Sequence, residues 1–91
     1  MSGGQEIRFS IEPRLEQEGD LWTAYCDELG LASCGESLDE ALENLRGAIT
    51  AFCRALARKG LLEDTLDRAG IKAERVPASE AAPRVRVAVP A

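Results

Sequence analysis

The sequence predicts an α+β fold: a three-stranded antiparallel meander plus a C-terminal strand, one long helix packed on the sheet and a short second helix. Two observations carry this prediction. Apolar residues alternate with polar ones in short segments before residue 35, and they recur at helical spacing from residue 38 onward. We expect a disordered N-terminus over 1–5, one domain over 6–75, a linker over 76–83 and a strand over 84–91.

The first strand is predicted over 6–13, where Ile7, Phe9 and Ile11 alternate with polar residues. Such alternation is typical of a strand that buries one face. The next residues, 14–20, are polar and end in a Gly-Asp pair, which favours a turn between strands.

The second strand is predicted over 21–26, which is rich in aromatic and β-compatible residues. The chain then turns over 27–30 and returns as a third strand over 31–34. We expect one face of the second strand to contact the helix, because two small side chains there leave room for large ones; this face carries Trp22, Ala24 and Cys26.

A capping box starts the long helix. Ser37 precedes Glu40 by three residues, so the hydroxyl is expected to accept from the Glu40 N–H while Glu40 reaches back to the N–H of Ser37. The helix therefore begins at Leu38 and ends near Gly60, a residue that readily takes the left-handed conformation. Its apolar stripe comprises Leu38, Ala41, Leu42, Leu45, Ala48, Ile49, Phe52 and Leu56.

The remainder of the chain predicts a short second helix over 61–69, ended by Gly70. Two prolines and small residues over 76–83 favour a linker. The last strand, over 84–91, is expected to join its own sheet or that of a neighbouring subunit, through an edge that carries Val85, Val87 and Val89.

Charge is distributed unevenly along the chain. Residues 1–46 hold eleven acidic and three basic side chains, a net charge of −8, whereas residues 47–91 hold five acidic and eight basic ones, a net charge of +3. The acidic half repels nucleic-acid phosphates and suits a basic protein partner. An acidic surface that serves solubility alone is the alternative interpretation.

Composition argues against several kinds of chemistry. The three cysteines have no CxxC spacing and the chain has no histidine, so we expect no metal site, no cofactor and no catalytic residues. Histidine is also the commonest general base. No apolar run is long enough to cross a bilayer and no signal peptide is recognisable, so we expect a cytoplasmic protein that does not bind membranes.

The order of these motifs resembles the HicB-like antitoxin family, over about residues 6–60. The motifs are Trp22-Thr23-Ala24-Tyr25, Asp27-Glu28-Leu29-Gly30, Gly35-Glu36-Ser37-Leu38-Asp39-Glu40-Ala41 and Leu42-Glu43-Asn44-Leu45. The resemblance implies a partial RNase H-like fold in a small homo-oligomer, a dimer or tetramer. It also implies a role as an antitoxin, or an orphan relative, that neutralises a small basic HicA-type toxin RNase by occluding its active site.

The chain departs from full-length HicB antitoxins in one respect. Those proteins usually carry a C-terminal DNA-binding module, whereas here only a linker and one strand follow Gly70. We therefore expect no autonomous nucleic-acid binding. A small oligomeric ligand-binding or structural protein of the same fold, without a toxin partner, is the alternative function. A metal-dependent nuclease would need a carboxylate set that the motifs do not supply.

Two groups of residues are candidates for interfaces. Exposure and charge favour a partner interface at Trp22, Tyr25, Asp27 and Glu28. A row of small residues along the long helix permits close approach of another helix, either the second helix or one from another subunit; this row is Gly47, Ala51 and Ala55. The same row is otherwise an exposed surface that contacts nothing.

Overall fold

The computed structural model describes residues 5–77 and 86–90. Their fold is α+β, as predicted. The elements in chain order are β1 (Gln5–Ser10), β2 (Arg14–Glu18), β3 (Leu21–Cys26), β4 (Leu31–Gly35), α1 (Leu38–Arg58), α2 (Leu62–Arg68), β5 (Glu74–Pro77) and β6 (Arg86–Pro90).

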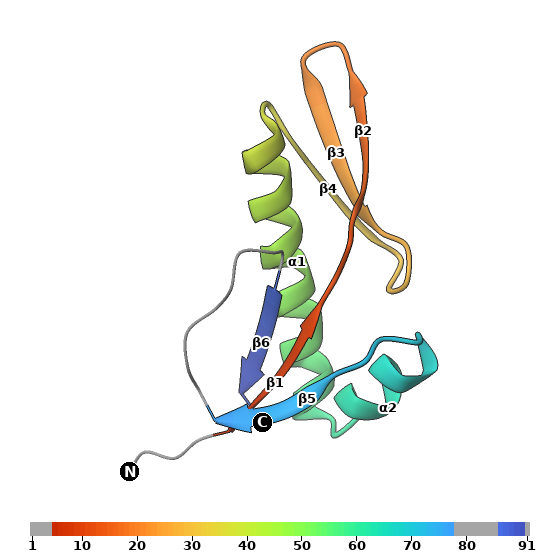
Figure 1. The fold of residues 1–91 in the computed structure, drawn as a ribbon, viewed down its shortest axis with the longest axis vertical. Coiled ribbons are helices and arrows are strands. Elements are labelled where there is room, and N and C mark those ends of the chain that lie inside the picture. Colours follow the sequence, from red (N-terminus) through yellow and green to blue (C-terminus); the bar gives the residue numbers. More distant parts are fainter. Residues whose placement is uncertain (1–4, 78–85, 91) are drawn as a thin grey trace.

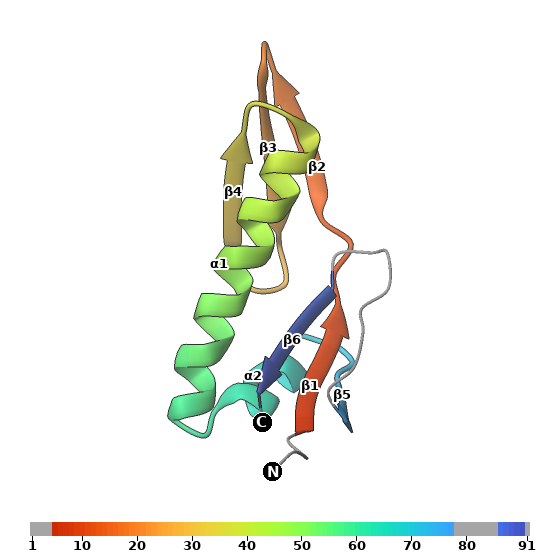
Figure 2. The same cartoon turned by 90° about the vertical axis from the view of Figure 1, so that its left-hand side faces the viewer.

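The strands form two antiparallel sheets of three strands each, with the orders β2-β3-β4 and β5-β1-β6. The helix α1 runs along both sheets, packing on β4 and β3 near its start and on β6 further down (Figures 1 and 2). The molecule is therefore elongated, with principal extents of 47 × 26 × 19 Å.

The predicted meander exists, but its first strand is different. The strand expected over 6–13 ends at Ser10 as β1, and the polar residues expected to form a turn segment contain β2. Pro13 stands between the two strands; it lacks a backbone N–H and restricts the residue before it, so the pairing breaks there. The predicted turn at Gly19 is confirmed, with a φ of 61°.

One hydrophobic core joins the sheets to the helices. On β3, Ala24 and Cys26 are fully buried and Trp22 packs against the core, so the predicted helix-facing side is confirmed. The buried core residues are Ile7, Phe9, Ile11, Ala24, Cys26, Ala41, Leu45, Ile49, Cys53, Leu62, Leu66 and Ile71.

The start of α1 follows the predicted capping box with one change. The Ser37 Oγ accepts a hydrogen bond from the Glu40 N–H at 3.1 Å, and the helix begins at Leu38. The Glu40 carboxylate, however, accepts from the N–H of Glu36 at 2.6 Å and not from that of Ser37. Glu40 therefore holds the backbone of Glu36, the residue between β4 and the N-cap Ser37.

Gly35 lets β4 run very close to the first turn of α1. A Cβ added at Gly35 would lie 2.7 Å from the backbone N of Ala41 and 2.9 Å from the carbonyl carbon of Glu40. Asn44 adds a second tie, since its Nδ2 donates to the carbonyl oxygen of Cys34 at 3.0 Å. A side chain larger than that of glycine would therefore collide with the helix backbone at this position.

Both helices end in the same motif, with a left-handed glycine after the last turn. At Gly60, φ is 71° and the N–H donates to Ala57, while the N–H of Leu61 donates to Leu56. Gly70 closes α2 in the same way. These are Schellman motifs, and the predicted ends of both helices are confirmed.

The C-terminal region differs from prediction at its start. Residues 76 and 77, expected in the linker, lie in β5, which pairs with β1. The predicted last strand is present as β6 and pairs with β1 of the same chain. Residues 78–85, which include the rest of the linker and Val85, lie outside the described residues. So does the expected disordered N-terminus, except Gln5, which begins β1.

Candidate functional site

The hairpin of β2 and β3 stands out from the body of the molecule (Figure 1). All five residues of β2 are exposed, because α1 packs on β3 and β4 and does not extend over β2. β2 is also the outer strand of its sheet, so one of its backbone edges has no neighbouring strand among the described residues.

This region, residues 14–28, is termed the acidic hairpin. It contains the β2–β3 hairpin and the start of the turn that leads to β4. It carries one arginine against five carboxylates, a net charge of −4. The carboxylates are all exposed: Glu16, Glu18, Asp20, Asp27 and Glu28.

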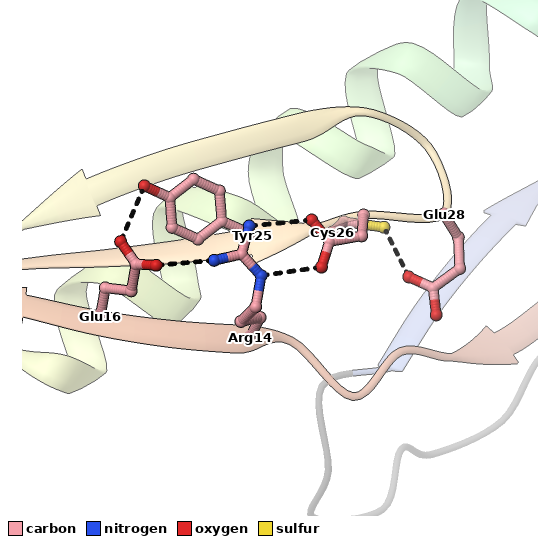
Figure 3. Close-up of polar contacts among 6 residues, drawn as sticks. Arg14, Glu16, Tyr25, Cys26 and Glu28 are labelled. Atoms are coloured by element: carbon pink, nitrogen blue, oxygen red, sulfur yellow. Dashed lines mark hydrogen bonds and ion pairs between the residues drawn. The ribbon is translucent and has the colours of Figure 1, made fainter.

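Arg14 holds the base of the acidic hairpin together. Its Nε donates to Asp27 Oδ2 at 2.9 Å and its Nη2 to Asp27 Oδ1 at 3.1 Å, a two-pronged bond across the sheet. Its Nη1 donates to Glu16 Oε2 at 2.7 Å. Figure 3 shows the Arg14 guanidinium beside the Glu16 carboxylate.

Tyr25 completes this cluster. It lies directly opposite Arg14 in the ladder, and the guanidinium carbon is 4.1 Å from the centre of its ring, in a cation–π contact. The Tyr25 hydroxyl donates to Glu16 Oε1 at 3.3 Å (Figure 3). The Arg14 cluster is therefore Arg14, Glu16, Tyr25 and Asp27.

The charges of the Arg14 cluster perturb one another. Hydrogen bonds from Arg14 lower the pKa of the Asp27 carboxyl below its ordinary value, and the same bonds raise the pKa of the guanidinium. Because both side chains are about half exposed, solvent screens their attraction. Arg14, the only basic residue of the acidic hairpin, is thus bound to carboxylates of the same hairpin. Glu18 and Asp20 are exposed and have no ion-pair partner among the described residues.

The predicted partner residues are only partly brought together. Tyr25 and Asp27 share the Arg14 cluster, whereas Trp22 lies on the opposite face of β3, half-buried against the core. Trp22 therefore offers no fully exposed aromatic surface to a partner. Glu28 is adjacent and accepts a weak hydrogen bond from the Cys26 thiol, with 3.7 Å between sulfur and oxygen (Figure 3).

Sequence reasoning missed Arg14 and Glu16. Their signal is the alternation of charged residues with Leu15 and Gln17 just before the turn at Gly19. From sequence alone this segment is predicted as a polar turn, because neither of its two sets of alternating side chains is consistently apolar.

The predicted oligomer residues lie apart from the acidic hairpin. Gly47, Ala51 and Ala55 are exposed, and a Cβ at Gly47 would meet no atom within 4 Å. Packing of this row on α2 of the same chain is therefore wrong, while packing on another subunit stays a prediction. Val87 and Val89 belong to β6, where they lie opposite Phe9 and Ile7 of β1.

The thiols offer little reactive chemistry. Cys26 and Cys53 are buried and Cys34 is exposed, and none is in a disulfide. Burial raises the pKa of the Cys53 thiol to about 11 and also raises that of Cys26. Within residues 5–77 and 86–90, no three potential ligand residues converge on a metal position.

A concave feature lies between α2 and β5. It is a cleft of about 500 Å³ with an apolar floor of Ile7, Leu66 and Ile71. Its rim carries charged side chains, among them Asp67, Lys72 and Glu74.

Comparisons of the chain with protein-family models, curated proteins and solved structures give no match. The likeness to HicB-like antitoxins therefore rests on the residue pattern described above. Across the described residues, neither helix has both the length and the apolar character that crossing a membrane requires.

Proposed function

We propose that this chain is a HicB-like antitoxin, or an orphan relative, that neutralises a small basic HicA-type toxin RNase by steric occlusion. The observation that carries the proposal is the acidic hairpin: five exposed carboxylates on the projecting β2–β3 hairpin and on the turn that follows it. Such a surface attracts a basic protein at long range and orients it for docking.

The surface is suited to binding rather than catalysis. Arg14 and Asp27 are tied to each other, and Tyr25 is tied to Glu16, so the groups at the base of the acidic hairpin are engaged in structure. Inhibition would then come from covering the partner's active site. The chain itself would contribute rigid shape and negative charge.

The test is affinity capture of the full chain from its native host, with identification of bound proteins and an assay of their RNA cleavage. We expect a small basic protein whose binding weakens as salt increases, because screening shortens the range of charge attraction. The chain should also suppress that protein's RNase activity. Recovery of the chain alone would contradict the proposal.

Two matched variants locate the binding surface. Glu18→Gln with Asp20→Asn removes two charges from the acidic hairpin, where neither residue has a described partner. Asp67→Asn with Glu74→Gln removes two charges from the far end of the molecule. The first pair should weaken capture and the second should not; equal losses would point to net charge rather than this surface.

A second candidate function is a small oligomeric ligand-binding or structural protein of the same fold. The cleft between α2 and β5 favours it, since it joins an apolar floor to a charged rim. Native mass spectrometry of the chain purified from its host tests this candidate. A retained small molecule that is lost in the Asp67→Asn/Glu74→Gln variant would support it, and a ligand-free chain would weigh against it.

A further inference from the structure

We propose that β2 is a docking edge for an extended basic segment, which adds to the sheet as a fourth strand antiparallel to β2. For the identity of its natural partner this inference rests on the proposed function. The binding mode itself is argued from the open edge of β2, its side-chain chemistry and its turn geometry.

The backbone of β2 has groups free to pair. The loop at Gly19 and Asp20 has two residues, and only the first has a positive φ, which defines a type II′ turn. Such a turn makes Glu18 and Leu21 a hydrogen-bonded pair. By the alternation of an antiparallel ladder, the N–H and C=O groups of Leu15 and Gln17 point away from β3, toward the open edge.

The side chains of β2 specify what the added strand must carry. Glu16 and Glu18 project on one face, and Leu15, which is 40% exposed, and Gln17 project on the other, beside Trp22. A strand with basic residues opposite the glutamates and apolar residues opposite Leu15 complements both faces. The segment therefore alternates Lys or Arg with apolar residues.

A second copy of the chain complements this edge less well than a basic segment does. An antiparallel pairing centred on Leu15 sets Glu18 against Glu12 of the second copy. One centred on Glu16 sets the two Glu16 side chains against each other, and one centred on Gln17 sets Glu16 against Glu18. The first two registers also set Arg14 against Glu16 or Glu18, but Arg14 is already bound to Asp27 and Glu16 of its own chain. Like charges directly opposite are destabilising, and each copy brings an acidic hairpin of net charge −4.

The experiment titrates a blocked heptapeptide of alternating lysine and valine into the full chain. Two readouts are used: backbone amide shifts, and the fluorescence of Trp22, the sole tryptophan, which lies opposite Gln17. We expect the largest shifts in β2 and a change in Trp22 emission. A peptide of alternating glutamate and valine should not bind.

Gln17→Pro is the decisive variant, because it removes an outward N–H while leaving the β2–β3 ladder intact. It should weaken peptide binding about tenfold, the effect of one lost backbone hydrogen bond. Gln17→Thr keeps the N–H and should bind like the parent chain. If thermal melting shows that Gln17→Pro does not fold, Glu18→Lys replaces it and should weaken binding through charge.

Several outcomes would overturn the inference: no peptide binding, shifts confined to residues outside the acidic hairpin, or equal binding by the acidic peptide. A dimer abolished by Gln17→Pro would assign the edge to a second copy instead. A captured host protein that binds the Gln17→Pro variant as tightly as the parent chain would refute strand addition but leave the proposed function standing. Peptide binding at β2 without any basic host partner would support strand addition but contradict the proposed function.

Discussion

Replacing Gly35 by alanine should destabilise the protein through one specific collision. The new Cβ would lie 2.7 Å from the Ala41 backbone N and 2.9 Å from the carbonyl carbon of Glu40. Both are backbone atoms of the first helical turn, which cannot rotate aside as a flexible side chain would. β4 and the start of α1 must therefore separate, straining the bond from Asn44 to Cys34.

Overpacking of this kind costs typically about 1–3 kcal/mol. We expect a loss near 2 kcal/mol, which corresponds to a fall in melting temperature of roughly 8–16 °C for a domain of this size. Thermal and urea unfolding followed by circular dichroism measure it. Because small domains have only about 5–15 kcal/mol of stability, the change is large on that scale.

Gly47→Ala is the matched control, since the same substitution there should have the opposite sign. Gly47 lies inside α1, and an added Cβ would meet nothing within 4 Å. Alanine favours a helix interior over glycine by about 1 kcal/mol, so this variant should melt roughly 4–8 °C higher. Unchanged stability of Gly35→Ala, or a gain like that of Gly47→Ala, would refute the close approach of β4 to α1.

Three further predictions concern the cap, the thiols and the Arg14 cluster. Ser37→Ala should lower the free energy of unfolding by about 1 kcal/mol in urea titrations, whereas Ser37→Asp should change it little. A thiol reagent should modify Cys34 rapidly and the buried Cys26 and Cys53 only in denaturant; three equal rates would contradict the buried core. Arg14→Gln should raise the pKa of Asp27 in an NMR titration, because the depressed folded-state pKa comes chiefly from hydrogen bonds donated by Arg14. Since that pKa is depressed, the contribution of Asp27 to stability is present above about pH 4 and is lost as the pH falls further; identical acid unfolding of the parent and Arg14→Gln chains would contradict it.

The parts of the fold that follow from burial and local chemistry were predictable. Ser37 marks the start of α1 and Gly60 its end, because capping depends on residues adjacent in sequence. The same holds for Ala24 and Cys26, whose alternation along β3 signals a buried face. Each of these signals is contained within a few neighbouring residues.

The parts that were missed depend on pairing between distant residues. The proline-containing second half of β5, Val76 and Pro77, is predicted as linker, yet β5 pairs along β1. The Arg14 cluster exists because the register places Arg14 opposite Tyr25 and close to Asp27. The turn at Gly19 and Asp20 sets that register only once residues 14–18 are known to form a strand. Charge and composition alone therefore point to Tyr25 and Asp27 without their common partner.

β2 was missed for a reason that bears on function. Strands are recognised by a buried face, and β2 buries none: its residues are held by the ladder to β3 and by the ties from Arg14. Charged side chains on an exposed edge are one way in which proteins prevent edge-to-edge aggregation. On β2 the one arginine, Arg14, is bound to Asp27 and Glu16 of its own chain, so the remaining charge is negative and disfavours a second copy while attracting a basic strand. Specificity is a difference between two affinities. On this edge the same carboxylates raise the affinity for a basic strand and lower the affinity for a second copy.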